Sequence, residues 1–194
     1  MPHIYQPSED SYLLSEILKQ ELPIILEKNP GLILLEIGSG SGIHLETALS
    51  CGVKKQNIFS SDINPSAVDH CNSLGFNCVH SDLFEAFKEK AIVKKTPVSL
   101  KFDLIIFNPP YLPLDKNEPE DSRLATTGGK SGNEIILRFL NEARSYLHTK
   151  GKIFLVTSSL TPKINFKKFG YKEKQIGCEN LFMEQLCVWE LSKV

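Results

Sequence analysis

Residues 102–112 have the sequence FDLIIFNPPYL, and this stretch decides the fold expected for the whole chain. Its first six residues are mostly apolar and rich in β-formers, which predicts a buried strand. Two consecutive prolines end that strand, because proline has no N–H group for the sheet ladder and forces the preceding residue into extended geometry. Asn108 is therefore expected at the carboxyl end of a strand, directly before Pro109 and Pro110.

Asn108 has the chemistry to hold a planar amino group. Its side-chain oxygen and a nearby main-chain carbonyl, that of Pro109, are two acceptors on a stiff frame. Together they can accept both hydrogens of a planar –NH2 group, and the ring of Tyr111 offers that group a flat surface. We therefore predict that a catalytic substrate site is formed by Asn108, Pro109, Pro110 and Tyr111. The alternative is a turn that only ends the strand.

Composition narrows the class of protein. The chain has 194 residues, 41% hydrophobic and 23% charged, which suits one globular domain with a sizeable core. Its formal net charge of −1 does not predict nucleic-acid binding. Five cysteines without a CxxC pair and five scattered histidines predict a reducing compartment, no disulfide framework and no metal site. Without a membrane-length apolar run or a signal-peptide pattern, we expect a cytoplasmic protein that makes no membrane contact.

A glycine-rich turn follows the predicted strand of residues 32–37. Gly38, Gly40 and Gly42 alternate between that strand and a helix expected over residues 43–51, so the backbone can approach a ligand at the helix N-terminus. The spacing is GxGxG, not the GxGxxG of pyrophosphate binders. Glu36 lies directly before the turn, where a carboxylate repels phosphate. These features favour a cofactor without phosphates.

Carboxylates also follow the next two predicted strands. Asp62 ends the strand of residues 57–62, where α/β nucleotide-binding folds place an acid on ribose hydroxyls. Asp82 comes just after the short strand of residues 76–80. Carboxyl ends of parallel strands meet at one edge of the sheet, so Glu36, Asp62 and Asp82 are expected to line one site.

The flanking segments complete the predicted topology. A helix is expected to begin with Ser8 as its cap and to present Ser11 to a ligand, and another to begin at Asn64. The five lysines and the proline of residues 88–101 predict a solvated linker. Residues 113–131 are polar and irregular, and a structureless loop of that length is usually functional or mobile.

The C-terminal third predicts one more helix and three strands. A capping box formed by Ser131 and Glu134 opens the helix, which Gly151 ends. A fifth strand is predicted at residues 152–157. Residues 158–168 are too short for a full helix, and the strands of a closing hairpin follow at residues 170–176 and 184–191.

These motifs together resemble the class I S-adenosylmethionine (SAM) dependent methyltransferases that act on planar nitrogen. The nearest resemblance is to the short HemK-like release-factor glutamine N5-methyltransferases of eukaryotes and archaea. It rests on five segments, YQPSEDSYLL at 5–14, LEIGSGSG at 35–42, DINP at 62–65, SDL at 81–83 and NPPY at 108–111. The implied fold is an α/β, Rossmann-like single domain over residues 1–194, with a helical cover at 1–30 and a catalytic core at 31–194. Its seven-stranded, mostly parallel sheet has a C-terminal antiparallel hairpin and the order 3-2-1-4-5-7-6.

The resemblance also implies roles for individual residues. Gly38 and Gly40 lie against the methionine moiety of SAM with Glu36 nearby, and Asp62 binds the ribose. Asp82 and the Leu83 backbone hold adenine, and Ser11 closes over the cofactor. The implied cofactor-binding set is thus Ser11, Glu36, Gly38, Gly40, Asp62, Asp82, Leu83 and Asn108, with no metal.

The resemblance implies two protein partners, a peptide chain release factor as substrate and a small zinc-binding activator on the edge strand of residues 76–80. That strand has no Lys or Pro to discourage pairing with another chain. The alternative is that residues 88–101 fold over it.

Other functions remain open at this point. An adenine or guanine N-methyltransferase acting on RNA or DNA would use the same NPPY motif, but the net charge of −1 and only three arginines do not favour it. The five lysines between Lys163 and Lys174 are the one feature in its favour. A protein-lysine methyltransferase, a nucleotide-dependent oxidoreductase and a non-catalytic scaffold are the remaining alternatives.

Overall fold

The computed structural model describes residues 4–88 and 101–194, and the predicted strand of residues 102–107 is β4 (Phe102–Phe107) in a seven-stranded sheet. The other strands of that sheet are β1 (Leu34–Ile37), β2 (Ile58–Asp62), β3 (Asn77–His80), β7 (Leu147–Ser158), β8 (Tyr171–Leu181) and β9 (Glu184–Lys193). The helices are α1 (Glu9–Lys28), α2 (Ile43–Ser50), α3 (Pro65–Ser73), α4 (Glu85–Lys88), α5 (Glu120–Thr126) and α6 (Glu134–Tyr146), with 3-10 turns η1 (Lys55–Asn57) and η2 (Phe166–Phe169). The predicted lysine-rich linker falls almost wholly outside the described residues.

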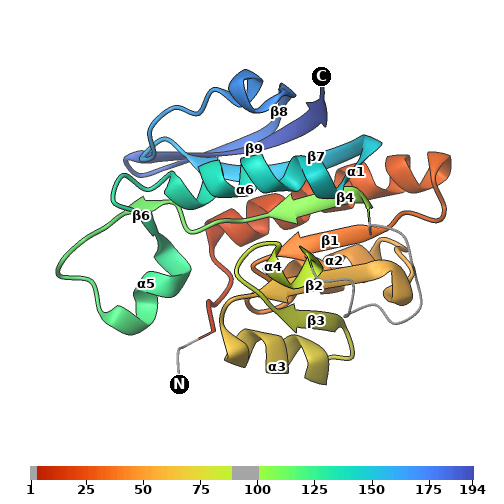
Figure 1. The fold of residues 1–194 in the computed structure, drawn as a ribbon, viewed down its shortest axis with the longest axis horizontal. Helices are drawn as coiled ribbons and strands as arrows, with labels where there is room; N and C mark the ends of the chain where they lie inside the picture. Colours follow the sequence, from red (N-terminus) through yellow and green to blue (C-terminus); the bar gives the residue numbers. More distant parts are fainter. Residues whose placement is uncertain (1–3, 89–100) are drawn as a thin grey trace.

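The strand order is β3-β2-β1-β4-β7-β9-β8 (Figure 1). Neighbouring strands from β3 to β7 pair in parallel, whereas β9 pairs antiparallel with both β7 and β8. This confirms the predicted class I methyltransferase fold with its C-terminal hairpin. The carboxyl ends of β1, β2, β3 and β4 therefore lie at one edge of the sheet, where the predicted site residues are found.

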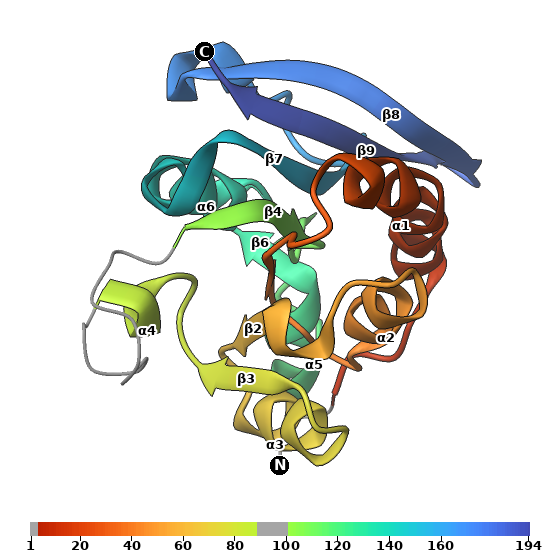
Figure 2. The same cartoon turned by 90° about the vertical axis from the view of Figure 1, so that its right-hand side faces the viewer.

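Helices cover both faces of the sheet (Figure 2). The central strands β1 and β4 are buried on both sides because their residues are almost all apolar. Successive residues of a strand point to opposite faces of the sheet, so their side chains belong to two separate apolar clusters. One cluster holds Leu34 and Leu104 with side chains of α1, α2 and α3, and the other holds Leu35 and Ile105 with side chains of α6.

The segment of residues 113–131 is more regular than predicted. It contains α5 and a small two-stranded sheet of β5 (Leu112–Pro113) and β6 (Thr127–Gly129). The Glu118 carboxylate accepts hydrogen bonds from the hydroxyls of Ser122, Thr126 and Thr127, which ties the two ends of α5 together. The prediction of an irregular loop was therefore wrong. Hydrogen bonds from hydroxyls to a carboxylate order this segment, and they leave no periodic apolar pattern in the sequence from which a helix could be predicted.

Helix capping differs in detail from the sequence prediction. Asn64 caps α3 as expected, accepting from the Ser66 amide at 3.0 Å. Ser8 is the N-cap residue of α1, but its hydroxyl bonds the Glu9 carboxylate and makes no cap bond. At α6 only the glutamate half of the predicted box forms, with Glu134 accepting from the amide of Ser131 at 2.9 Å.

The prediction of a chain without disulfides is wrong. Cys178 and Cys187 form a disulfide bond, with Cα atoms 4.1 Å apart. They lie directly opposite each other in the antiparallel pairing of β8 with β9. Both strands are longer than predicted, and a bulge between Gln175 and Gly177 sets their register. Spacing in the sequence gives no sign of that register.

β3 lies at the edge of the sheet as predicted, but its edge is not open along its whole length. The Asn72 side chain, from α3, accepts from the Cys78 amide at 3.1 Å and donates to the Cys78 carbonyl at 3.0 Å. The Phe76 amide just before the strand donates to the Cys71 carbonyl. The prediction of an unprotected edge is therefore wrong at Cys78, because a neighbouring helix supplies a polar side chain to it.

Two features of the described residues bear on wider function. No helix in 4–88 or 101–194 has both the length and the apolar character needed to cross a membrane. The same ranges hold no group of three or more His, Cys, Asp or Glu side chains placed to bind a metal ion.

Candidate active site

A pocket opens at the carboxyl edge of the sheet and gathers nearly all of the predicted site residues. Its wall includes Ser11, Gly38, Gly40, Asp62, Asp82, Leu83, Asn108, Pro109, Pro110 and Tyr111. Glu36 lies behind this wall with its side chain 1% exposed. The topology thus brings residues from the start of α1, the glycine loop and the ends of β2, β3 and β4 to one cavity.

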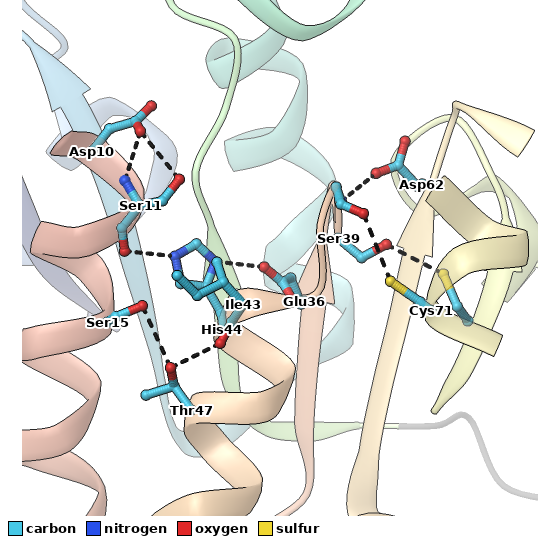
Figure 3. A network of polar contacts seen from close by, with 12 residues as sticks. Asp10, Ser11, Ser15, Glu36, Ser39, Ile43, His44, Thr47, Asp62 and Cys71 are labelled. Atoms are coloured by element: carbon cyan, nitrogen blue, oxygen red, sulfur yellow. Dashed lines mark hydrogen bonds and ion pairs between the residues drawn. The ribbon is translucent and has the colours of Figure 1, made fainter. Parts of the chain in front are cut away.

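Asp62 holds the glycine loop against the end of β2 (Figure 3). One of its carboxylate oxygens accepts from the Gly40 amide and the other from the Asn64 amide, both at 2.8 Å. Gly40 has a φ of 48°, a left-handed conformation that favours glycine and leaves its amide free to face Asp62. Burial raises the pKa of Asp62 above its usual value, and the amide bonds offset part of that rise.

Glu36 and His44 form a buried pair beside the cavity, which sequence reasoning missed. His44 Nδ1 lies 2.7 Å from Glu36 Oε1, and His44 Nε2 lies 3.1 Å from the carbonyl oxygen of Ser11 (Figure 3). With Glu36 ionised, both partners are acceptors, so both ring nitrogens donate and the two side chains form an ion pair. Burial lowers the pKa of His44, but the Glu36 carboxylate and the Ser11 carbonyl raise it by more, so the net shift is upward. The pair joins β1, α2 and α1 at one point.

Asp10 joins the N-terminal segment to the NPPY turn. Its side chain is 5% exposed and accepts from the Ser11 amide at 2.6 Å. The phenols of Tyr5 and Tyr111 also donate to this carboxylate, at 3.1 Å and 3.5 Å. Sequence reasoning gave Asp10 no role of its own, because nothing local shows that it faces Tyr111.

Asp82 is held by an arginine that the sequence analysis did not single out. Arg138, on α6, donates from its guanidinium to Asp82 at 2.8 Å, and both residues line the cavity. Leu83 follows with a φ of 48°, which is uncommon for a residue with a branched side chain. Its carbonyl accepts from the hydroxyls of Ser61 and Ser81, which hold that strained conformation in place.

Asn108 sits at the end of β4, where the prolines stop the sheet. Its side-chain oxygen is buried and has no hydrogen-bond partner within the described residues. Leaving a buried acceptor unpaired costs about 1–3 kcal/mol, so most buried acceptors have a hydrogen-bond partner. The oxygen therefore offers an unused acceptor next to the cavity.

The comparisons with known proteins agree with this geometry. Residues 13–174 match the family model described as the methyltransferase small domain. This chain belongs to that methyltransferase family. A Methanocaldococcus jannaschii protein provisionally named protein N5-glutamine methyltransferase is 39% identical, over 98% of this chain and 93% of its own. Mouse methyltransferase HEMK2 is 28% identical, over 98% of this chain and 90% of its own.

A solved structure supports the fold of this small-domain methyltransferase. A chain in the structure of the E. cuniculi Mtq2–Trm112 complex aligns over 100% of both chains, with a TM-score of 0.69 and 23% sequence identity. The family match confirms the family implied by the five sequence motifs, and this alignment confirms the fold. The protein is an enzyme of the methyltransferase class.

Proposed function

We propose that this methyltransferase transfers a methyl group from SAM to the side-chain amide nitrogen of a glutamine in a translation termination factor. The observation that carries the proposal is the buried, unpartnered side-chain oxygen of Asn108, a residue that lines the cavity. An amide –NH2 is a hydrogen-bond donor that such an acceptor can hold. The M. jannaschii relative's name specifies the same chemistry.

The cavity wall suits SAM as the methyl donor. Carboxylates of Asp10, Asp62 and Asp82 lie on the wall, and its one arginine, Arg138, is already paired with Asp82. A dinucleotide would bring phosphates to these acids, whereas SAM brings none and carries a positive sulfonium. When bound, SAM supplies an electrophilic methyl group. We assign Asp62 to the ribose, Asp82 with the Leu83 backbone to adenine, and Ser11, Gly38 and Gly40 to the methionine moiety, with Glu36 supporting the last group from behind.

The residues around Asn108 position the nucleophile. A glutamine amide nitrogen is a poor nucleophile because its lone pair is delocalised into the carbonyl. Asn108 and the Pro109 carbonyl accept its two N–H groups, which fixes the nitrogen and favours the positive charge that develops on it. Pro110 stiffens the turn, and the ring of Tyr111, held through its phenol by Asp10, bounds the site on one side. No side chain is assigned as a general base.

The proposed substrate and partner rest on the neighbours. The E. cuniculi Mtq2–Trm112 complex is described as responsible for methylation of the translation termination factor eRF1. We extend both the substrate and the partner to this chain, with a release factor as substrate and a small zinc-binding activator of the Trm112 kind on the edge strand β3. Because translation termination takes place in the cytoplasm, we assign the protein to that compartment.

The test is methyl transfer to purified acceptors in the presence of the activator. Labelled SAM is incubated with the release factor, tRNA and rRNA, and mass spectrometry locates the methyl group. We expect it on a glutamine amide of the release factor. Asn108→Ala should lower turnover by about 10²–10³-fold while SAM affinity changes only a few-fold.

Asn57→Ala provides the matched control, because Asn57 bonds the Gly31 carbonyl far from the cavity. Its turnover should equal that of the wild type. Methyl label on a base, or on a lysine, would replace the proposed substrate. Full turnover by Asn108→Ala would remove the role given to that residue.

A further inference from the structure

Exposed apolar side chains of the described residues gather at the edge of the sheet where the cavity opens. Most large apolar residues on a protein surface occur singly, whereas a contiguous group marks an interaction site. Seven lie at this edge, namely Tyr12, Ile63, Leu114, Leu124, Leu160, Phe182 and Met183. Of the three others, Ile24 and Leu49 lie in the C-terminal halves of α1 and α2, and Val194 directly follows β9.

The most exposed of these residues form the tip of the β8–β9 hairpin, Leu181–Glu184. Phe182 is 93% and Met183 82% exposed, so neither contributes to the core. β9 runs antiparallel to β7, with Leu186 opposite Ser158 at the carboxyl end of β7. The tip therefore projects at the same end of the molecule as α5 and β6 (Figure 1). Met183 has a φ of 63°, a left-handed conformation that is uncommon for a residue other than glycine.

Two hydrogen bonds fix the tip to the segment after β7. The Ser159 amide donates to the Gln185 carbonyl at 2.8 Å, and the Gln185 amide donates to the Ser159 hydroxyl at 2.9 Å. Ser158 donates to the Glu184 carboxylate at 2.5 Å. Leu160, 46% exposed, is thereby held beside the tip. The apolar group is part of a rigid scaffold, which lowers the entropy lost when a partner binds.

Two of these exposed apolar residues also border the cavity that Asn108 lines. Ile63 and Leu124 are exposed and also line the cavity wall. On the other side, Glu184 of the tip is close enough to Tyr111 for its charge to help raise the pKa of that phenol, after burial and Asp10. Leu124 of α5 and Tyr111 of the NPPY turn both line the cavity.

The chemistry of this rim indicates the class of partner. A nucleic acid is held by a track of basic residues against its phosphates. The polar side chains fixed beside this rim carry both signs of charge: the acids Glu184 and Glu118, and Arg123 of α5, which donates to the Lys116 carbonyl. An apolar surface with neighbours of both signs, and not a track of basic residues, suits the surface of a folded protein.

We propose that the hairpin tip, with Leu160, Leu114 and Leu124, docks an apolar surface of the protein substrate next to the loop that carries the acceptor glutamine. This inference rests on the proposed function and adds how the substrate is chosen. The Asn108 site would recognise only an amide group, and the rim would select the protein on which that amide is presented.

The experiment compares an intact release factor with a short free peptide that contains its acceptor glutamine. The variant is Phe182→Ser with Met183→Asn, since asparagine tolerates a positive φ. Its KM for the intact factor should rise at least about tenfold, the effect of losing one buried large apolar contact. Its kcat/KM for the peptide and its SAM affinity should equal those of the wild type. Ile24→Ser, at an exposed apolar position on the far end of α1, is the matched control and should change none of these values.

Each outcome has a distinct meaning. Equal KM values for variant and wild type on the intact factor would overturn the docking role while leaving the proposed function standing. Equal losses on factor and peptide would show a structural defect of the site and would also overturn it. If the variant loses transfer to RNA instead, Phe182 stacks on a base and the protein-docking inference is wrong. Absence of transfer to the release factor by the wild type would remove the proposed function, and this inference with it.

Discussion

The phenol of Tyr111 donates a hydrogen bond to the carboxylate of Asp10, 3.5 Å away and 101 residues earlier in the chain. The same carboxylate accepts from Tyr5 and from the Ser11 amide. Burial, followed by the charge of Asp10, raises the pKa of both phenols above their usual value, so both remain donors at physiological pH. The start of α1 is in this way tied to the turn that carries the substrate site.

Asp10→Ala should weaken both substrate positioning and SAM binding. The change leaves two phenols and one amide without their acceptor, and an unpaired buried donor costs about 1–3 kcal/mol. We expect a lower free energy of unfolding in urea, a weaker SAM affinity by calorimetry and a higher KM for the acceptor. Tyr111→Phe should keep the flat ring and lose only the bond to Asp10, which makes its effect the smaller one.

Tyr12→Phe is the control for these variants, because Tyr12 lies on the same helix with its side chain 55% exposed. It should match the wild type in stability and turnover. If Asp10→Ala keeps wild-type SAM affinity, the tie between α1 and the NPPY turn has no role in cofactor binding.

The Glu36–His44 pair should make stability depend on pH. Removing one partner of a buried ion pair typically costs about 3–5 kcal/mol, so His44→Gln is expected to lower the free energy of unfolding strongly. The folded-state pKa of His44 lies above its unfolded value. Its stabilisation is therefore fully present below the unfolded pKa of about 6.5 and is lost as the pH rises through the folded value.

Urea unfolding from about pH 6 upward, in a range that spans the unfolded histidine pKa, measures this effect. The stability difference between wild type and His44→Gln should shrink as the pH rises. His80→Gln is the control, because His80 is exposed and bonds only the Ile63 carbonyl among the contacts described. A difference that stays constant with pH would mean that His44 is neutral and acts by packing alone.

The sheet edge that carries the site could be predicted from the sequence because its signals are local. The apolar run before Asn108, the glycine loop after Glu36 and the acids Asp62 and Asp82 each mark a strand end by their neighbours in the chain. Because parallel strands have their carboxyl ends at the same edge of a sheet, their pairing alone brings those residues together. The order of strands came from the resemblance to a family and not from periodicity.

The contacts that support the site could not be predicted in the same way. His44 meets Ser11 across 33 residues, and Arg138 meets Asp82 across 56. Such pairs depend on how α1 and α6 lie on the sheet, which no local pattern specifies. The Cys178–Cys187 disulfide depends on hairpin register, and the order in residues 113–131 depends on hydroxyl bonds to Glu118. Helix packing, hairpin register and hydrogen bonds of this kind cannot be read from a single sequence.

Asp82 and Arg138 should act on cofactor affinity with little effect on stability. Their side chains are 35% and 49% exposed, and ion pairs at such positions stabilise a fold by at most about 1 kcal/mol. We expect Arg138→Gln to leave the urea midpoint nearly unchanged and to weaken SAM binding, because Asp82 then loses its fixed orientation. Asp82→Ala should weaken SAM binding by roughly 5–150-fold, the range for losing a buried polar contact.

Lys19→Gln is the control for the arginine variant, since Lys19 forms an exposed ion pair with Glu16 on α1. Neither stability nor SAM affinity should change in that variant. Tighter SAM binding by Arg138→Gln would show the reverse role, with the arginine occupying the carboxylate that the cofactor needs.

The edge strand β3 gives the last prediction, on the proposed activator. Asn72 accepts from the Cys78 amide and donates to the Cys78 carbonyl, so the main-chain groups that a partner strand would use at Cys78 are already bonded. A partner that adds a strand to this edge has to displace the Asn72 side chain. In the isolated chain, the Asn72 side chain would thus protect the edge. In the complex, main-chain hydrogen bonds from the partner strand would replace its two bonds to Cys78.

Asn72→Ala is therefore expected to have opposite effects on the free and bound protein. The isolated chain should lose stability, because Cys78 loses two bonds of about 1 kcal/mol each, and it should aggregate more readily through the exposed edge. The activator should bind roughly 30-fold more tightly, since it no longer displaces a side chain held by two bonds that together contribute about 2 kcal/mol. Calorimetry with a Trm112-like protein measures the affinity, and Ser73→Ala, whose hydroxyl bonds the His70 carbonyl, is the neighbouring control. Unchanged affinity in Asn72→Ala would mean that the activator does not pair with the main chain at Cys78.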